Sequence, residues 1–266
     1  MKADMIRLSN KKAAGEKMSR GLVGCLMGVV VIACSACGGG GGGSTAPAPV
    51  VAKAPNSVLI AEYGDSTTAG WQVNNGVGAN TSASEPVELQ SYLQAQFGTT
   101  VTVSNQGVGG TEASQLLNGT DGTHGAWFNE IAASKAQIVT FNFSLNDAFF
   151  SVTQRDGTIN ESVDQYKGYM VALIEGAKSA GKKVVVYTPN PTCEAVRVPI
   201  LPQYVDALKA VAASENVPIV DNYGIISAMP NWQAMLSDCL HPNDALYAIK
   251  AKNEADVLAP IVKSLL

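Results

Sequence analysis

Two histidines are available in this 266-residue chain to act as a general base, and His241 is the better candidate, because His124 lies in a loop with no predicted strand end beside it. His241 ends the sequence Asp238-Cys239-Leu240-His241, so Asp238 can reach back within one turn and accept a hydrogen bond from the imidazole Nδ1. This pairing leaves Nε2 free to take a proton from a hydroxyl group. The alternative interpretation is an ordinary Asx-type turn before the last helix. His124, in the loop Asp121-Gly122-Thr123-His124-Gly125, is expected to be a solvated turn residue.

Ser66 carries the hydroxyl that such a base could activate. It lies in the sequence Gly64-Asp65-Ser66-Thr67, directly after an apolar run at residues 57–63 that is typical of a buried strand. On a tight turn after a strand, its side chain would be presented as a nucleophile. The alternative interpretation is a helix cap, which is a frequent role of Asp-Ser after a strand. Serine, histidine and aspartate together are the groups that perform acyl transfer.

Acyl transfer also requires hydrogen-bond donors aimed at the developing oxyanion. Residues 105–111, Asn-Gln-Gly-Val-Gly-Gly-Thr, contain three glycines at which a backbone N–H can face the site. Asn146, in Ser144-Leu145-Asn146-Asp147, can donate through its side-chain amide. For the glycines, the alternative is a phosphate-binding turn or a helix entry. A dinucleotide-binding fingerprint is excluded, because Glu112 stands where that motif requires a third glycine.

Motifs for other hydrolytic chemistries are missing from the sequence. It contains no Gly-x-Ser-x-Gly elbow, no His-Glu-x-x-His motif and no cysteine–histidine spacing typical of zinc. Two histidines would supply a metal ion poorly. We therefore expect a covalent mechanism that uses no metal and no other cofactor.

Short apolar runs alternate with helical patterns from Asn56 to the end of the chain. Buried strands are predicted at 57–63, 100–104, 137–143, 183–188 and 217–220, and helices at 86–97, 164–180, 201–214 and 244–266. This alternation is typical of a parallel sheet with helices on both faces, in which ligands bind beyond the carboxyl ends of the strands. The sequence therefore predicts one doubly wound α/β domain whose candidate residues gather at one edge of the sheet.

The segments that carry these candidates resemble, in order and spacing, the four sequence blocks of the GDSL esterases, also called SGNH hydrolases, over about residues 56–266. The resemblance implies a flavodoxin-like three-layer α/β/α sandwich with a central, mostly parallel five-stranded sheet. It also implies that Ser66 is the nucleophile and that Asp238 and His241 complete its catalytic triad. The oxyanion hole implied by the resemblance consists of the Ser66 amide, Gly110 and Asn146. The chain departs from the family pattern at Thr67, where leucine is usual, and at Ser144, where glycine is usual. We expect these changes to tune the pocket rather than to abolish activity.

The function implied by the resemblance is that of a serine-dependent carboxylic ester hydrolase. Small acyl esters, O-acetylated glycans and lipid esters are all open as substrates. Trp71, Trp127 and the pair Phe149-Phe150 lie near predicted strand ends or in loops, where they could stack on a sugar or line an acyl groove. For the two phenylalanines, a core or helix-entry position is the alternative. The alternative function is that of a non-catalytic surface lipoprotein that binds a glycan or a protein partner.

Residues 1–33 have the form of a secretory signal peptide of the lipoprotein type. Basic residues precede an uncharged apolar run at 21–33, which is too short to span a bilayer. The end of this run, Val31-Ile32-Ala33-Cys34, resembles the bacterial lipobox, which implies that Cys34 receives lipid. Cys37 is a second candidate, and a plain secretory peptide is the alternative.

Residues 34–55 are rich in glycine and proline, have the composition of a flexible tether and lead to the domain at 56–266. Met18 would be a more typical start of translation than Met1. We therefore expect an exported monomer of the bacterial cell envelope, either secreted or anchored at the outer membrane through its N-terminal lipid, with an ester as its substrate.

Cys193 and Cys239 are the two cysteines of the predicted domain. In the oxidising compartment that export implies, they are predicted to form a disulfide. Two separately buried thiols are the alternative. The bond would stabilise the domain by about 4 kcal/mol in the chain-entropy model, and we expect it to position the loop that carries Asp238 and His241.

The charge of the chain argues against a nucleic-acid partner. The 18 Lys/Arg and 22 Asp/Glu residues give a net charge of −4. Six of the basic residues but only two of the acidic ones lie within residues 1–33, so the remainder is more acidic than the whole. A surface of this sign repels a phosphate backbone.

Overall fold

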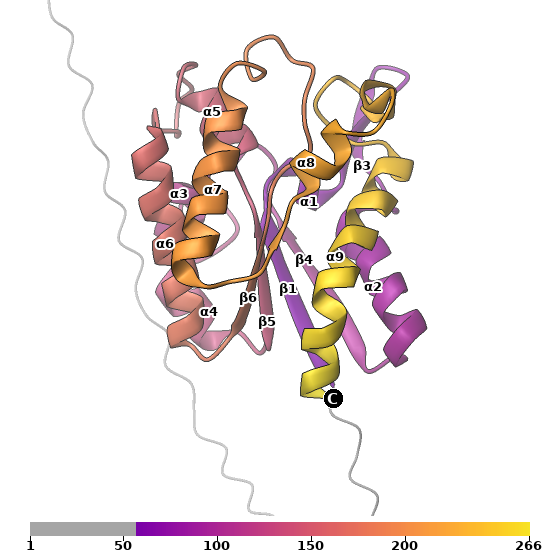
Figure 1. The fold of residues 1–266 in the computed structure, drawn as a ribbon. Coiled ribbons are helices and arrows are strands. Elements are labelled where there is room, and N and C mark those ends of the chain that lie inside the picture. The colour runs from indigo at the N-terminus through magenta and orange to yellow at the C-terminus, as the bar shows by residue number, and fades with distance from the viewer. Residues whose placement is uncertain (1–56) are drawn as a thin grey trace, which may run out of the picture. The chain divides into compact units, whose positions relative to one another are not determined.

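Five parallel strands form the central layer of residues 57–266, the part of the chain that this computed structural model describes (Figure 1). The strands are β1 (Val58–Gly64), β4 (Val101–Gly107), β5 (Ile138–Asn142), β6 (Lys183–Tyr187) and β7 (Ile219–Val220). Their order across the sheet is β4-β1-β5-β6-β7, and every neighbouring pair is parallel. This is the strand order of a doubly wound, flavodoxin-like sheet, so the predicted fold class is confirmed.

The strands are apolar runs because the sheet is covered on both faces. All five residues of β5 are buried, as are six of the seven residues of β1. β1 lies between β4 and β5 in a register that ends the three strands together, since Gly64 is opposite Gly107 on one side and Asn142 on the other. The loops that follow these strands therefore begin side by side.

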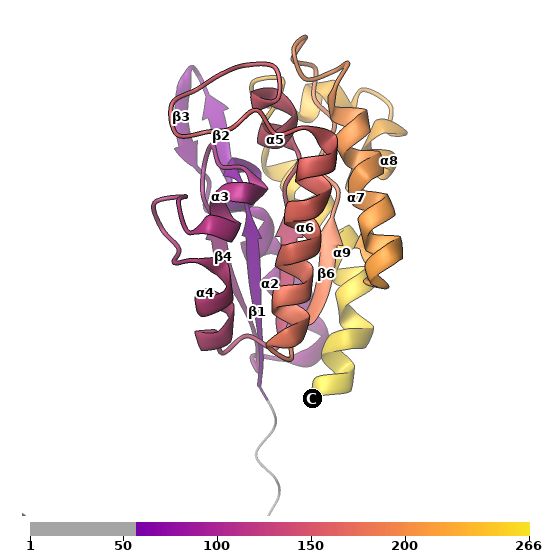
Figure 2. The ribbon, with the colours of Figure 1, turned by 90° about the vertical axis from the view of Figure 1, so that its left-hand side faces the viewer.

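Helices cover the sheet on both faces (Figures 1 and 2). One layer contains α3 (Ala113–Asn118), α4 (Trp127–Ala133), α5 (Leu145–Phe150), α6 (Val163–Ser179) and α7 (Leu201–Glu215), and the other contains α2 (Glu85–Phe97) and α9 (Asp244–Leu265). The longer helices follow the apolar periodicity of the sequence. In α6, for example, Met170, Leu173, Ile174 and Ala177 are all buried, at the spacing that places side chains on one helix face.

A hairpin lies outside the central sheet, and the apolar pattern does not predict it. Its strands are β2 (Trp71–Asn74) and β3 (Val77–Asn80), and all four residues of β3 are exposed. The turn between them is Asn75-Gly76, and both residues have positive φ angles, of 52° and 77°. An Asn-Gly pair is a strong signal for a two-residue hairpin turn, so this dipeptide could have revealed the element.

Smaller differences concern short elements. The strand predicted at 217–220 is limited to Ile219–Val220, because Pro218 has no N–H to donate to a ladder. The short helices α1 (Ser66–Ala69) and α8 (Asn222–Ser227) and the 3₁₀ helix Trp232–Met235 are too brief to show a period in the sequence.

The N-terminal predictions lie outside the described residues. These are the signal peptide at 1–33, the lipidation of Cys34 and the tether at 34–55. Within residues 57–266, no helix combines the length and the apolar character needed to cross a membrane.

Candidate active site

Ser66 is the first residue of α1, a single helical turn that follows β1. Asp65 caps this turn, and its carboxylate accepts hydrogen bonds from the Thr67 N–H at 2.8 Å and the Thr67 hydroxyl at 2.9 Å. Glycine is required at position 64, because a Cβ there would lie 2.7 Å from the carbonyl oxygen of Asn142. Both interpretations of the motif therefore apply, but to different residues: Asp65 is the cap, and the Ser66 side chain faces a cavity.

Ser66, His241 and Asp238 form an unbroken hydrogen-bonded chain at the carboxyl edge of the sheet. Ser66 Oγ lies 2.9 Å from His241 Nε2, and His241 Nδ1 lies 2.8 Å from Asp238 Oδ2. The other oxygen of Asp238 accepts the backbone N–H groups of His241 at 2.8 Å and of Leu240 at 3.2 Å. Burial opposes the ionisation of Asp238, but these hydrogen bonds outweigh it and hold the pKa of the carboxyl below its ordinary value. An ionised Asp238 favours the tautomer with the proton on Nδ1, which leaves Nε2 to accept the Ser66 proton.

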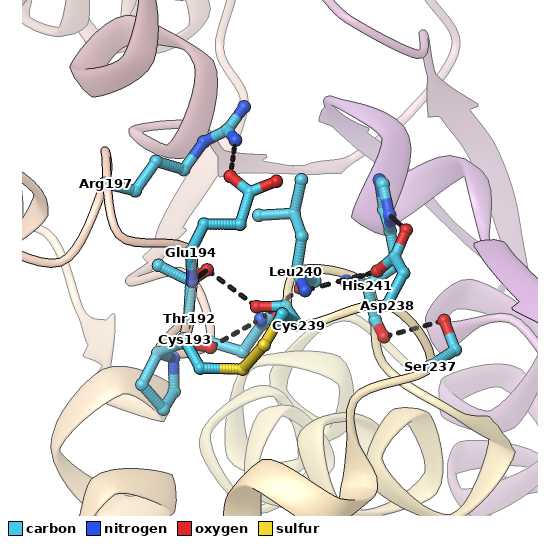
Figure 3. The surroundings of a disulfide bond; sticks show 11 residues. Thr192, Cys193, Glu194, Arg197, Ser237, Asp238, Cys239, Leu240 and His241 are labelled. Atoms are coloured by element: carbon cyan, nitrogen blue, oxygen red, sulfur yellow. Dashed lines mark hydrogen bonds and ion pairs between the residues drawn. A yellow bond between two sulfur atoms is a disulfide. The ribbon is translucent and has the colours of Figure 1, made fainter.

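A disulfide holds the loop that carries Asp238 and His241 (Figure 3). The predicted bond between Cys193 and Cys239 is present, with the two Cα atoms 4.9 Å apart. Cys193 also donates its N–H to the Cys239 carbonyl oxygen at 2.9 Å. Within the loop, Ser237 donates its N–H to the His241 carbonyl oxygen at 2.7 Å. The segment after β6 is therefore joined to the loop before α9 both covalently and by a backbone hydrogen bond.

The glycine-rich segment after β4 meets Asn146, on α5, beside Ser66. Gly110 has a φ angle of 76°, which glycine adopts without strain. The Asn146 side chain donates from Nδ2 to the Thr111 carbonyl oxygen at 3.0 Å, which ties α5 to this segment. Ser66, Gly110 and Asn146 all line one cavity, together with His241. The structure thus brings together the residues that were predicted for the triad and the oxyanion hole.

The cavity beside Ser66 has a volume of about 660 Å³ and an aromatic wall. Trp71, Phe149 and Phe150 contribute this wall, and the Trp71 side chain is exposed at the rim. Trp127 is fully buried instead, and it donates its Nε1–H to the Leu173 carbonyl oxygen at 2.9 Å. The expectation that Trp127 contacts a substrate is therefore wrong, because helix α4 packs this side chain into the core.

His124 is buried, so the expectation of a solvated turn residue is wrong. Its Nδ1 lies 2.7 Å from Asp121 Oδ2, and its Nε2 lies 3.1 Å from Gln106 Oε1. The other oxygen of Asp121 accepts the backbone N–H groups of Thr123 and His124. This is the same local arrangement as in the Asp238–His241 pair, but Nε2 meets an amide oxygen, which has no proton to give.

Two arginines that no sequence motif indicates also line the cavity. The Arg155 guanidinium lies 5.8 Å from the centre of the Phe150 ring, and the Arg197 guanidinium lies 4.1 Å from the centre of the Phe149 ring. Arg155 is exposed, whereas Arg197 is only 5% exposed. Both residues lie outside the four blocks of the family pattern, so only their position in the structure connects them with the site.

A flavodoxin-like sheet with serine, histidine and aspartate joined at the edge where its strands end has the architecture of a serine hydrolase. A model of the GDSL-like Lipase/Acylhydrolase family matches residues 63–249, and the chain belongs to this family. Membership places the protein among the ester-hydrolysing enzymes. No curated protein is similar enough in sequence to match the chain.

Two solved structures share the fold. The lipase/acylhydrolase from Enterococcus faecalis has a TM-score of 0.61 and 21% identity, over 77% of this chain and 96% of that one. The acetylxylan esterase from Geobacillus stearothermophilus has a TM-score of 0.59 and 19% identity, over 76% of this chain and 94% of that one. At these identities, the likeness is one of fold.

Proposed function

We propose that the protein is a serine esterase in which Ser66 is the nucleophile. The observation that carries this proposal is the continuous chain from Ser66 Oγ through His241 to Asp238, with links of 2.9 and 2.8 Å. Ser66 Oγ attacks the ester carbonyl carbon while His241 Nε2 takes the hydroxyl proton. His241 then gives this proton to the departing alcohol, which leaves an acyl group on Ser66. Asp238 keeps the imidazole oriented and stabilises its charged form.

The negative charge that develops on the carbonyl oxygen requires donors that are already in place. We assign this role to the backbone N–H groups of Ser66 and Gly110 and to the side-chain Nδ2 of Asn146. Water then attacks the acyl carbon while His241 Nε2 takes one of its protons. As the bond to Ser66 Oγ breaks and the acid leaves, His241 returns this proton to Oγ. Each step moves one proton between an oxygen and Nε2, so the enzyme returns to its starting state.

The proposed substrates are small acyl esters, O-acetylated glycans or lipid esters. The aromatic wall formed by Trp71, Phe149 and Phe150 supports this range, because such side chains stack on sugar rings and also contact acyl chains. Among these, the acetylxylan esterase with the same fold favours O-acetylated glycans as the first class to test.

Hydrolysis of p-nitrophenyl esters from acetate to palmitate tests the proposal. Ser66→Ala is expected to lower kcat by about 10³-fold or more, because the nucleophile is removed. Ser91→Ala, on the exposed face of α2, is the control and should retain the wild-type rate. Equal rates for Ser66→Ala and wild type would contradict the assignment. Binding of a glycan without turnover of any ester by the wild type would instead favour the non-catalytic surface lipoprotein.

We also propose that the protein is an exported monomer anchored in the bacterial cell envelope through lipid on Cys34. The lipobox-like sequence before Cys34 and the glycine- and proline-rich residues 34–55 support this. Cells expressing Cys34→Ala are expected to lose the protein from the membrane fraction and to lose incorporation of labelled palmitate. Cys37→Ala is the matched control and should remain labelled; the reverse result would move the anchor to Cys37.

A further inference from the structure

Arg197 lies in the segment between β6 and α7, and each nitrogen of its guanidinium group has a polar partner. Nε donates to the Leu145 carbonyl oxygen at 2.9 Å, and Nη2 donates to Asn146 Oδ1 at 3.2 Å. Nη1 forms an ion pair with Glu194, and the central carbon Cζ lies over the Phe149 ring, 4.1 Å from its centre. Removing a guanidinium from water is unfavourable unless its donors are satisfied. Each of the three nitrogens of Arg197 has one such contact, and three of the contacts of the group, with Leu145, Asn146 and Phe149, are made to residues of α5.

The contact with Asn146 decides which way the amide of that residue points. An arginine has only donors, so it can hold the amide oxygen but not the amide nitrogen. On the other side, the Thr111 carbonyl oxygen can only accept, and it holds Nδ2 at 3.0 Å. Rotating the amide by half a turn would place donor against donor and acceptor against acceptor. The two contacts together therefore fix the Asn146 side chain in one orientation, in which Nδ2 keeps a second hydrogen for another acceptor.

The positive charge of Arg197 also favours hydrogen-bond donation by the Asn146 amide. A guanidinium on the carbonyl end of an amide draws electron density toward the oxygen and strengthens the N–H groups as donors. Glu194 balances the charge of Arg197 at Nη1, on a different edge of the guanidinium from the edge that holds Asn146. Cys193, in the same segment, is bonded to Cys239 in the loop of the catalytic base, so the disulfide joins the two segments that carry Arg197 and His241 (Figure 3).

We propose that Arg197 is a positioning residue for the oxyanion hole: it orients and polarises the Asn146 amide so that Nδ2 meets the developing oxyanion. The inference rests on the proposed esterase function and on the role assigned there to Asn146. Arg197 acts through Asn146 and takes no proton.

A double-mutant cycle tests this coupling. kcat and KM for p-nitrophenyl acetate are measured for wild type, Asn146→Ala, Arg197→Met and the double variant, together with the unfolding midpoint of each. Loss of one oxyanion donor is expected to lower kcat by about 10²-fold in Asn146→Ala. Arg197→Met, which keeps an apolar stem, is expected to lower kcat by about 10-fold or more with little change in KM. In the Asn146→Ala background, the same Arg197→Met change should have almost no further effect on kcat.

Arg155→Met is the matched control, because Arg155 lines the same cavity and has its guanidinium 5.8 Å from the centre of the Phe150 ring, but makes no hydrogen bond to Asn146. Arg155→Met should change kcat by the same factor in the wild-type background and in the Asn146→Ala background, because the two residues act independently. Arg197→Lys keeps the charge but loses the forked donors, so it should lower kcat less than Arg197→Met does, and its effect should also disappear in the Asn146→Ala background. It serves as the test if Arg197→Met does not fold.

The possible results distinguish the role of Arg197 from the esterase function on which it rests. Equal losses for Arg197→Met in both backgrounds would overturn the coupling while leaving Asn146 in the oxyanion hole. An unchanged kcat in Asn146→Ala would remove the role assigned to Asn146, and the inference with it. Loss of activity in Ser66→Ala would still support the esterase in either case.

Discussion

Ser144 adopts a backbone conformation that side chains rarely occupy, with a φ angle of 120°. Its N–H donates to Asp147 Oδ2 at 2.8 Å, and its hydroxyl lies 2.7 Å from the Tyr166 hydroxyl. Asp147 in turn accepts the Ala113 N–H at 2.9 Å, so this capping arrangement links the start of α5 to α3. Glycine, usual at this position in the family pattern, would adopt the conformation without strain. Serine is strained in this conformation, but its hydroxyl forms a buried hydrogen bond with Tyr166 that glycine could not form.

Comparing Ser144→Gly with Ser144→Ala removes the hydroxyl from both variants, so the remaining difference is the strain of a Cβ at this φ angle minus the extra unfolded-chain entropy of glycine. The glycine variant is expected to unfold with a free energy about 1 kcal/mol higher than that of the alanine variant, since only the alanine keeps a Cβ at this φ angle. Urea denaturation of both variants measures the difference. An alanine variant about 0.5–1 kcal/mol more stable than the glycine variant would show that the backbone here is not strained.

The disulfide links two separate parts of the fold, the segment after β6 and the loop before α9. Replacing Cys193 and Cys239 by alanine is expected to lower the free energy of unfolding by about 2–4 kcal/mol, as the unfolded chain regains conformations that the bond excludes. The esterase rate should fall as well, because the loop that carries Asp238 and His241 loses its covalent support.

Reduction of the wild type checks both effects through activity and the melting temperature. The double alanine variant is the control, because a reductant should change nothing further in it. Unchanged activity and melting temperature after complete reduction of the wild type would contradict the prediction.

A buried charged cluster connects the sheet with the helices on one face. Lys250 of α9 forms an ion pair with Glu85 of α2, and both side chains are almost completely buried. Burial would lower the pKa of Lys250, but the carboxylates of Glu85 and Glu254 raise it above its ordinary value. Nearby on β1, burial raises the pKa of Glu62 to about 8, with a further contribution from the charge of Glu85. One lysine therefore supplies the positive charge for several buried carboxyl groups.

Lys250→Met is expected to lower the free energy of unfolding by about 3–5 kcal/mol, because it leaves buried carboxyl groups without their counter-charge. Lys252→Met, two residues along the same helix, is the control. Lys252 pairs with Asp256 at 2.6 Å, but both side chains are more than half exposed, so the change should be below about 1 kcal/mol. Urea denaturation compares the two variants. Similar losses in both would contradict a role for the buried cluster in stability.

The sequence by itself determined the layers of this protein and most of the residues of the candidate site. The apolar runs of the central strands and the helical period of α6, α7 and α9 depend on neighbours within a few positions, so they can be recognised without the fold. The same is true of the Asp65 cap and of the Asp238–His241 pair, whose hydrogen bonds span three residues or fewer.

The sequence favoured His241 as the base, but only the tertiary structure shows which of two matching local arrangements meets the nucleophile. Asp121–His124 and Asp238–His241 have the same spacing and the same local hydrogen bonds, yet His241 alone is brought to Ser66, across 175 positions of sequence. Arg197 likewise reaches Asn146 across 51 positions, with no motif to mark it. Such contacts depend on which strands are neighbours and where they end, and strand order is set by the packing of the whole sheet rather than by adjacent residues.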